Sequence, residues 1–184
     1  MESLRKALPG AALLLLWLFS FFTGLLGIDY GYHWDEHRLI GSLADTARSG
    51  VPLPVWYNYP SLSYDLSLLG SLSRLGQAPG DLLQVYASRR PPRYNAGGSP
   101  PTLIRTRVIF LAASLATAIY TAWIAWLLSR RRWVALLAGA IFLSSWEVAY
   151  HARWIAPDGL LMHCSALAVL LALLALRQPE SRLA

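Results

Sequence analysis

Long apolar stretches interrupt the sequence and determine its predicted architecture. Stretches 7–28, 108–129 and 159–176 contain no Asp, Glu, Lys or Arg, and stretch 133–150 contains only Glu147. At 1.5 Å per residue these stretches cover about 27–33 Å, comparable with a bilayer core of about 30 Å. The pattern therefore predicts an all-α polytopic membrane protein, with four transmembrane helices in a single membrane domain that comprises residues 1–184.

Three of these spans have a competing interpretation. Arg5 and Lys6 precede the first apolar stretch, as they would in a signal peptide. No clear small-x-small cleavage site follows Phe22, so an uncleaved anchor is favoured. The last two stretches could instead form one re-entrant hairpin, although each is about long enough to cross a bilayer.

The composition supports the membrane class. The mean hydropathy is +0.41, and only 14% of residues are charged, against about 25% in an average soluble domain. In a soluble protein a net charge of +6 would suggest nucleic-acid binding. Here several arginines flank the apolar spans, so they are interpreted as topology signals and contacts to membrane lipids, with no nucleic-acid partner. A single cysteine, Cys164, excludes a disulfide scaffold.

The distribution of basic residues predicts an orientation. Arg130, Arg131 and Arg132 fill a very short loop between the second and third spans, and such a loop belongs in the cytoplasm. Segment 29–107 then faces outside. We expect an integral, multi-pass membrane protein.

Segment 29–107 is too long for a simple linker and is expected to carry interfacial helices. Residues 39–49 have a helical pattern, and a proline-rich stretch follows them. In 61–75, leucines recur at positions 62, 66, 69 and 72 with polar residues between them. This spacing predicts an amphipathic helix lying on the membrane surface.

Two acidic clusters are the main candidates for chemistry. Asp35 and Glu36 follow the first span closely, and a carboxylate pair there can act as a general base or a cation ligand. The alternative is a solvated helix start, which acids favour. His33 and His37 are four residues apart and could share a helical face as metal ligands, or simply pack at the interface.

The second cluster lies around the start of the fourth span. Glu147 and His151 are four residues apart, and Asp158 follows Pro157, where it could equally cap a helix. By the predicted topology, Asp158 shares a membrane face with Arg105 and Arg107. Separated carboxylates and a cationic pair make a plausible site for a phosphorylated lipid, since arginine can bind phosphate through two hydrogen bonds. The two arginines could also simply snorkel to the headgroups.

Two further features concern packing within the membrane. His163 lies one turn into the fourth span, where a neutral, hydrogen-bonded side chain is favoured over a functional one. Ser114, Ala118 and Ala122 form a stripe of small residues in the second span, which predicts close contact with another helix.

The order of these motifs resembles a known family. An N-terminal span is followed by an acidic pair, then by Tyr59-Pro60 and an amphipathic helix, then by Arg105 at the start of a span that ends in arginines. The stretch from Ala152 to Leu161, with Pro157-Asp158 in its middle, opens the last span. This arrangement resembles the N-terminal module of the GT-C membrane glycosyltransferases, in the protein O-mannosyltransferase and aminoarabinose-transferase-like branch.

The resemblance implies roles for individual residues. Asp35 matches the catalytic base and Glu36 its acidic neighbour. Asp158 matches an acidic residue that shapes the site and in some members helps to bind a divalent metal ion, for which His151 is a weaker candidate. Arg105 matches an arginine that contacts the donor phosphate, and Arg153 lies in the matching Arg-x-x-x-Pro-Asp stretch.

The implied reaction is an inverting transfer of a sugar from a polyprenyl-phosphate-linked donor to an unidentified acceptor at the outer face. The resemblance also implies a bacterial inner (plasma) membrane, with the active face outside. Arg107 and Arg153 are grouped with Arg105 as candidates for binding the donor phosphate. Family members are usually longer and have more spans, so a truncated inactive fragment is one alternative. A non-catalytic membrane subunit or scaffold is another. A transporter is a third, although transporters usually place such carboxylates near the midplane.

Overall fold

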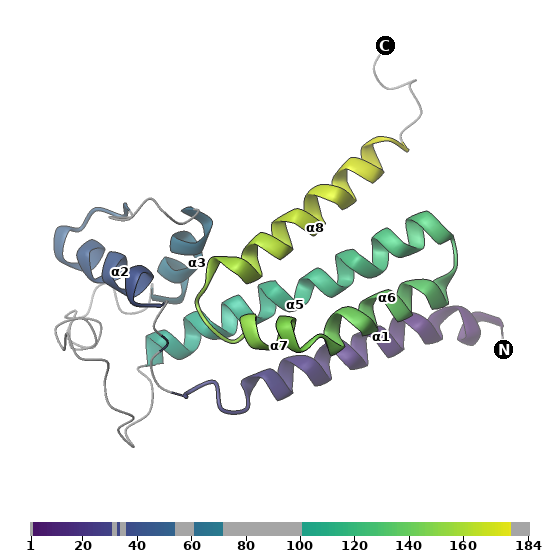
Figure 1. Cartoon of the computed structure of the whole chain (residues 1–184), viewed down its shortest axis with the longest axis horizontal. Helices are drawn as coiled ribbons and strands as arrows, with labels where there is room; N and C mark the ends of the chain where they lie inside the picture. Colours follow the sequence, from purple (N-terminus) through teal and green to yellow (C-terminus); the bar gives the residue numbers. More distant parts are fainter. Residues whose placement is uncertain (1, 31–32, 34–35, 54–60, 72–100, 178–184) are drawn as a thin grey trace, which may run out of the picture.

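The described part of the chain is helical throughout its regular structure. A computed structural model describes residues 2–30, 33, 36–53, 61–71 and 101–177 (Figure 1). Every regular element in these ranges is an α-helix, which confirms the all-α prediction. The helices are α1 (Glu2–Leu25), α2 (His37–Ser49), α3 (Ser61–Ser71), α5 (Pro101–Ser129), α6 (Arg132–Ser144), α7 (Trp146–His151) and α8 (Pro157–Ala175).

Three of the described helices are long and apolar enough to span a membrane. The qualifying segments are Leu8–Leu25 of α1, Leu103–Ser129 of α5 and Pro157–Ala175 of α8. In α5, 39% of the segment is buried inside the protein, against 11% in α1 and 17% in α8. α5 is therefore the central helix, and it packs against α1, α3, α6 and α8 (Figure 1). The predicted spans 7–28, 108–129 and 159–176 overlap these three helices.

The predicted span 133–150 is not one continuous helix in the structure. α6 ends at Ser144, Ser145 has an extended backbone (φ −67°, ψ 123°), and α7 starts at Trp146. The Ser144 hydroxyl donates a hydrogen bond to the Ala140 carbonyl at 2.7 Å. A serine hydroxyl that bonds back to the preceding turn slightly destabilises a helix and favours a bend there. α6 alone covers only about 20 Å.

A tight turn joins α5 to α6. Arg130 adopts the left-handed conformation (φ 58°), which reverses the chain after α5. The Arg177 guanidinium, just beyond α8, donates to the carbonyl of Leu127 in the last turn of α5. Cations near a helix C-terminus satisfy carbonyls that have no partner within the helix. The chain after α8 is thereby bound to the end of α5.

The predicted stripe of small residues lies at the helix contacts of the bundle. Ser114, Ala118 and Ala122 are all buried. A methyl group added at Gly139 of α6 would lie 3.4 Å from both the Ala118 carbonyl and the Ala122 Cβ. One added at Gly159 of α8 would collide with the Ser114 hydroxyl. Small residues on both sides let α6 and α8 approach α5 closely, as predicted.

In the described ranges, two helices lie between α1 and α5 in the sequence, at the predicted positions. Gly50, in the left-handed conformation, ends α2 and donates its N–H to the Thr46 carbonyl at 2.9 Å. α3 buries a small, polar face that contains Ser63, Tyr64, Ser67, Gly70 and Ser71, whereas Leu62 and Leu69 are exposed. The hydroxyls of Ser67 and Ser71 donate to carbonyls four residues earlier in α3, so their burial against α5 leaves neither without a partner.

Substitution of Gly70 tests this close packing. A methyl group there would lie 3.0 Å from the Thr106 Cα, and backbone cannot move aside as a flexible side chain can. Gly70→Ala should therefore lower the free energy of unfolding by about 1–3 kcal/mol. Gly10→Ala is the matched control, since a methyl group there would meet nothing within 4 Å. Unfolding in mixed detergent micelles, followed by circular dichroism, measures both, and equal stability of the two variants would contradict the packing.

Candidate functional site

A fully buried ion pair joins two residues that are far apart in the sequence. Arg107 Nε donates to Glu36 Oε1 at 2.8 Å, and Arg107 Nη2 donates to Glu36 Oε2 at 2.6 Å. Both side chains have no solvent exposure. The planar guanidinium thus binds the carboxylate in a bidentate geometry, with two parallel hydrogen bonds. Such charge-assisted hydrogen bonds are stronger than those between neutral groups. Glu36, Arg107 and the backbone groups that they bind are called the clamp below.

Each carboxylate oxygen of Glu36 also accepts a backbone hydrogen bond. The Ile155 N–H donates to Oε1 at 3.0 Å, and the His33 N–H donates to Oε2 at 3.2 Å. Ile155 belongs to the loop that leads into α8. One side chain thus binds the segment after α1, the first turns of α5 and the loop before α8.

The guanidinium of Arg107 is equally well coordinated. Its Nη1 donates to the Ile28 carbonyl at 2.7 Å, and its central carbon lies 4.1 Å from the centroid of the Tyr30 ring. A cation over an aromatic face is stabilised by the ring quadrupole, more so when water is excluded. Burial, together with the Glu36 carboxylate, raises the pKa of the Tyr30 phenol, so its hydroxyl stays protonated at neutral pH.

Arg153 also binds backbone groups near the end of α1. Its Nη2 donates to the Thr23 carbonyl in the last turn of α1 at 3.2 Å, and its own carbonyl accepts a 3.4 Å hydrogen bond from the Tyr30 hydroxyl. The predicted phosphate ligands Arg107 and Arg153 therefore both make contacts that hold helix ends together.

Arg105 and Arg107 do not form the cationic pair that their proximity in the sequence suggested. Residues two apart on a helix point to different sides. Arg107 is buried in the clamp, whereas Arg105 is exposed on the first turns of α5. The helical period thus assigns the two arginines to different environments, and Arg105 is the one accessible from outside the protein.

The second acidic cluster surrounds His151. Its Nε2 lies 3.8 Å from Glu147 Oε1, and its Nδ1 lies 3.8 Å from Asp158 Oδ2. Both carboxylates are largely exposed, and the imidazole is mostly buried. Nδ1 is buried without a hydrogen-bond partner among the described residues. Asp158 comes three residues after Ile155, so the clamp holds this cluster at the same end of the bundle.

Aromatic rings cover one side of that cluster. The Tyr150 ring lies 4.5 Å from the Trp154 ring and 5.0 Å from the Trp146 ring, and His151 stacks edge-on to Tyr150. Trp146 is 70% exposed, whereas Trp154 is buried. The rings of Trp146, Tyr150 and Trp154 therefore lie beside two exposed carboxylates, and they are called the aromatic shelf below.

This cluster does not fit a divalent metal ion by itself. Glu147 and Asp158 approach opposite nitrogens of the His151 ring, so one ion cannot bind all three. No group of three His, Cys, Asp or Glu side chains in the described ranges is arranged to hold a metal. Asp35 and the side chain of His37 lie outside the described residues. The divalent ion stays a prediction, with His151 and Asp158 offering one pair of donors.

His163 makes the contact that its position in an apolar span favours. Its Nδ1 lies 2.8 Å from the Ala113 carbonyl of α5, and its ring lies 5.1 Å from the Tyr120 ring. A carbonyl only accepts, so Nδ1 carries a proton. The side chain links α8 to α5.

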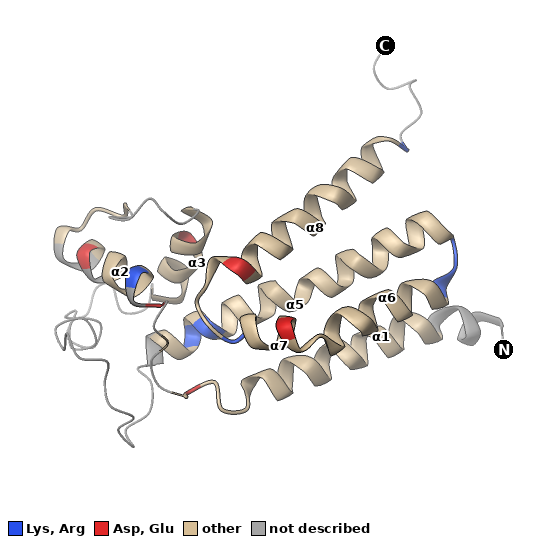
Figure 2. Cartoon of the chain, in the orientation of Figure 1, with Lys and Arg blue, Asp and Glu red and all other residues tan. Residues whose placement is uncertain are grey.

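The charged residues of the bundle gather toward two ends (Figure 2). The clamp, Arg105 and Asp158 define one end, called the clamp end. The turn with Arg130, Arg131 and Arg132 defines the other, called the arginine end. Arg107 and Trp126 are 19 positions apart on α5, which corresponds to about 28 Å.

Sequence reasoning selected Glu36 and Arg107 but missed that they bind each other. It also missed Tyr30. A signal was present: an Arg-x-Arg pair at the start of an apolar helix must direct one arginine inward, where it needs an acidic partner.

Comparisons of the chain with protein-family models, with curated proteins and with solved structures found no match.

Proposed function

We propose that this chain is the membrane part of a glycosyltransferase that moves a sugar from a polyprenyl-phosphate-linked donor to an acceptor at the outer membrane face. The observation that carries the proposal is the 3.0 Å hydrogen bond from the Ile155 N–H to Glu36 Oε1. It holds the segment that follows α1 against the loop that leads to Asp158. These are two of the segments to which the resemblance to GT-C enzymes assigns the reaction.

In the proposed sugar transfer, one acidic residue and three arginines have separate roles. The acceptor oxygen forms a bond to the anomeric carbon as the bond from that carbon to the phosphate oxygen breaks. Asp35, the sequence neighbour of Glu36, takes the proton from the acceptor hydroxyl. The departing phosphate gains negative charge, which Arg105 stabilises at the start of α5. Arg107 and Arg153 position the surrounding segments.

Exposure supports separate roles for the acidic residues. Glu36 is fully buried and already accepts four hydrogen bonds, so it positions the site and takes no proton. The Asp158 side chain is 58% exposed beside the aromatic shelf. Aromatic faces and carboxylates together suit a sugar, which offers both C–H faces and hydroxyl groups. We assign Asp158 to binding the sugar or the acceptor.

In the proposed membrane arrangement the third of four crossings is a broken helix, made of α6 and α7. α6 and α7 together cover about 28 Å, close to the thickness of a bilayer core. They return the chain from the arginine end to the clamp end, since Ile155 beyond α7 contacts Glu36. The arginine end then faces the cytoplasm, and the clamp end faces outside. A bacterial inner membrane fits this arrangement.

A non-catalytic membrane subunit is the second candidate. The observation that favours it is that Glu36, Arg107 and Arg153 all make contacts that hold helices and loops together. In that case the charges at the clamp end serve assembly alone, and no variant of an exposed residue there would alter sugar transfer.

Cysteine labelling tests the orientation. In a Cys164→Ser background, Asp158→Cys should react with a membrane-impermeant maleimide added outside intact cells. Arg131→Cys, at the exposed opposite end, should react only after permeabilisation. Both positions are solvent-accessible in the protein, so access from only one side reports topology. Labelling of position 131 in intact cells would contradict the proposed orientation.

Release of polyprenyl phosphate from hexosyl and pentosyl donors tests the activity without knowledge of the acceptor. In membranes that contain the full-length protein, Asp35→Asn should lower turnover by at least about 100-fold, because the base is lost. Arg105→Lys keeps the charge but loses the planar fork, so it should weaken use of the donor. Both variants should insert into the membrane normally.

The same substitutions elsewhere serve as matched controls. Asp65→Asn changes an exposed acid on α3, and Arg131→Lys changes an exposed arginine at the opposite end. Both controls should retain full donor turnover. Wild-type turnover in Asp35→Asn and Arg105→Lys would refute the proposed catalytic roles and favour the non-catalytic subunit.

A further inference from the structure

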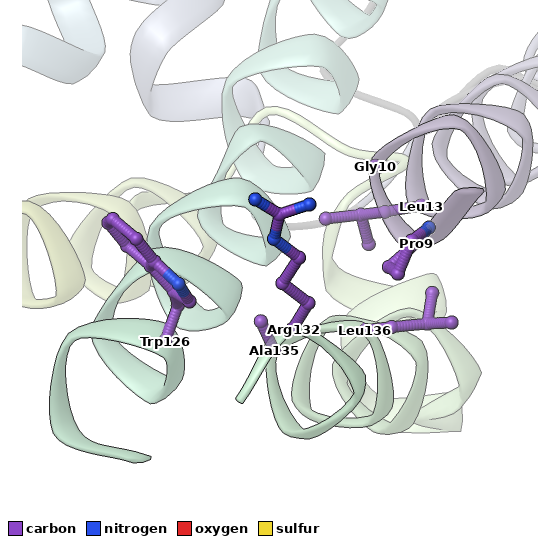
Figure 3. Close-up of a pocket in the computed structure, with 7 residues that line it drawn as sticks. All are labelled: Pro9, Gly10, Leu13, Trp126, Arg132, Ala135 and Leu136. Carbon is purple, nitrogen blue, oxygen red and sulfur yellow. The ribbon is translucent and has the colours of Figure 1, made fainter. Parts of the chain in front are cut away.

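The arginine end carries a pocket that the proposed sugar transfer does not use. It has a volume of about 260 Å³ and opens between α1, α5 and α6. Its main lining residues come from all three helices (Figure 3): Pro9, Gly10 and Leu13 of α1, Trp126 of α5, and Arg132 and Leu136 of α6. The volume lies just below the range of about 300–1,000 Å³ that is typical of small-molecule sites, so it suits part of a larger ligand.

Open space at Gly10 lies beside a close contact between α1 and α6. At Gly139 the two helices are in close contact, since an added methyl group would lie 2.5 Å from Leu13 Cδ1. At Gly10, one turn before Leu13, an added methyl group would meet nothing within 4 Å. Because residue 10 has no side chain, the pocket stays open at Gly10. This part of α1 lies near the polar boundary of the proposed membrane.

The charge of the pocket is positive. Figure 3 shows the Arg132 side chain extending into the space between Trp126 and the α1 residues. Arg132 is the first residue of α6, whose N-terminus adds a partial positive charge. The guanidinium of Arg130 lies 5.9 Å from the Trp126 ring centroid. Among the residues that the structure describes, none that lines the pocket is acidic.

A guanidinium above apolar side chains suits a molecule that has an anionic headgroup and an apolar chain. Arginine binds phosphate through two parallel hydrogen bonds, and basic clusters at the ends of spans attract anionic lipids. We propose that this pocket binds an anionic phospholipid of the membrane. Its phosphate contacts Arg132, and the upper part of one acyl chain lies against Leu13 and Leu136. This inference is independent of the proposed sugar transfer.

Native mass spectrometry of the full chain in detergent micelles tests the site. Phosphatidylglycerol is titrated against phosphatidylcholine, and bound lipid is counted. The wild-type protein should retain one phosphatidylglycerol at concentrations where phosphatidylcholine is lost. Arg132→Gln should weaken that binding about tenfold, which corresponds to the loss of about one charge-assisted contact. Inorganic phosphate at the same concentration should not displace the lipid, since it lacks the acyl chain.

Two further variants separate a built pocket from general attraction to positive charge. Arg131→Gln removes the same charge from the neighbouring residue, which does not line the pocket, and should change affinity less than about twofold. Gly10→Leu keeps every charge but fills the pocket, and it should weaken binding as Arg132→Gln does. Circular dichroism confirms that each variant is folded.

Three results would overturn the proposal. Equal losses in Arg131→Gln and Arg132→Gln would show attraction to charge alone. Unchanged binding in Gly10→Leu would show that the pocket is not used. Displacement by inorganic phosphate at the same concentration would show an anion site in place of a lipid site.

Discussion

The buried contact between Glu36 and Arg107 constrains the clamp end of the protein. Removing two charges from water costs several kcal/mol per ion, and only excellent geometry with additional hydrogen bonds offsets that cost. Here each carboxylate oxygen of Glu36 accepts two hydrogen bonds. The guanidinium of Arg107 also donates to the Ile28 carbonyl and lies over the Tyr30 ring. The arrangement is therefore intolerant of displacement. Moving the loop before α8 would leave a buried carboxylate undersatisfied.

The arginines show how helix position assigns different tasks to one residue type. Arg107 faces inward and pairs with an acid, whereas Arg105, two residues earlier, is exposed. Arg153 and Arg177 bind carbonyls at the C-terminal ends of α1 and α5. Arg132 extends into a pocket at the opposite end. The two proposed activities, sugar transfer at the clamp end and lipid binding at the arginine end, are thus separated by most of the length of α5.

Much of the framework could be predicted from the sequence, because it follows from hydropathy and helical period. The apolar stretches matched α1, α5 and α8, and the stripe of small residues matched the contacts of α5. The break at Ser145 was missed, since hydropathy is continuous across it. The burial of serines of α3 was also not predicted, because small polar residues can be buried when their hydroxyls bond within their own helix.

The candidate site was harder to predict, because its geometry depends on contacts between distant segments. Sequence spacing placed several candidate residues, including Asp158 and His151, at one end of the bundle. It could not show that Glu36 and Arg107 satisfy each other, since 71 positions separate them. Nor could it show that Glu147 and Asp158 approach opposite nitrogens of one imidazole. Such pairings are decided by the three-dimensional packing of the helices.

A double-mutant cycle across Glu36 and Arg107 tests the central claim most directly. Glu36→Met and Arg107→Met should each lower the free energy of unfolding by about 3–5 kcal/mol, because each leaves the other charge buried and unpaired. The double variant should be at least about 2 kcal/mol more stable than the sum of the single losses predicts. The measurement is equilibrium unfolding in mixed detergent micelles. Losses that add within about 0.5 kcal/mol would contradict the clamp, since they would show that the two residues act independently.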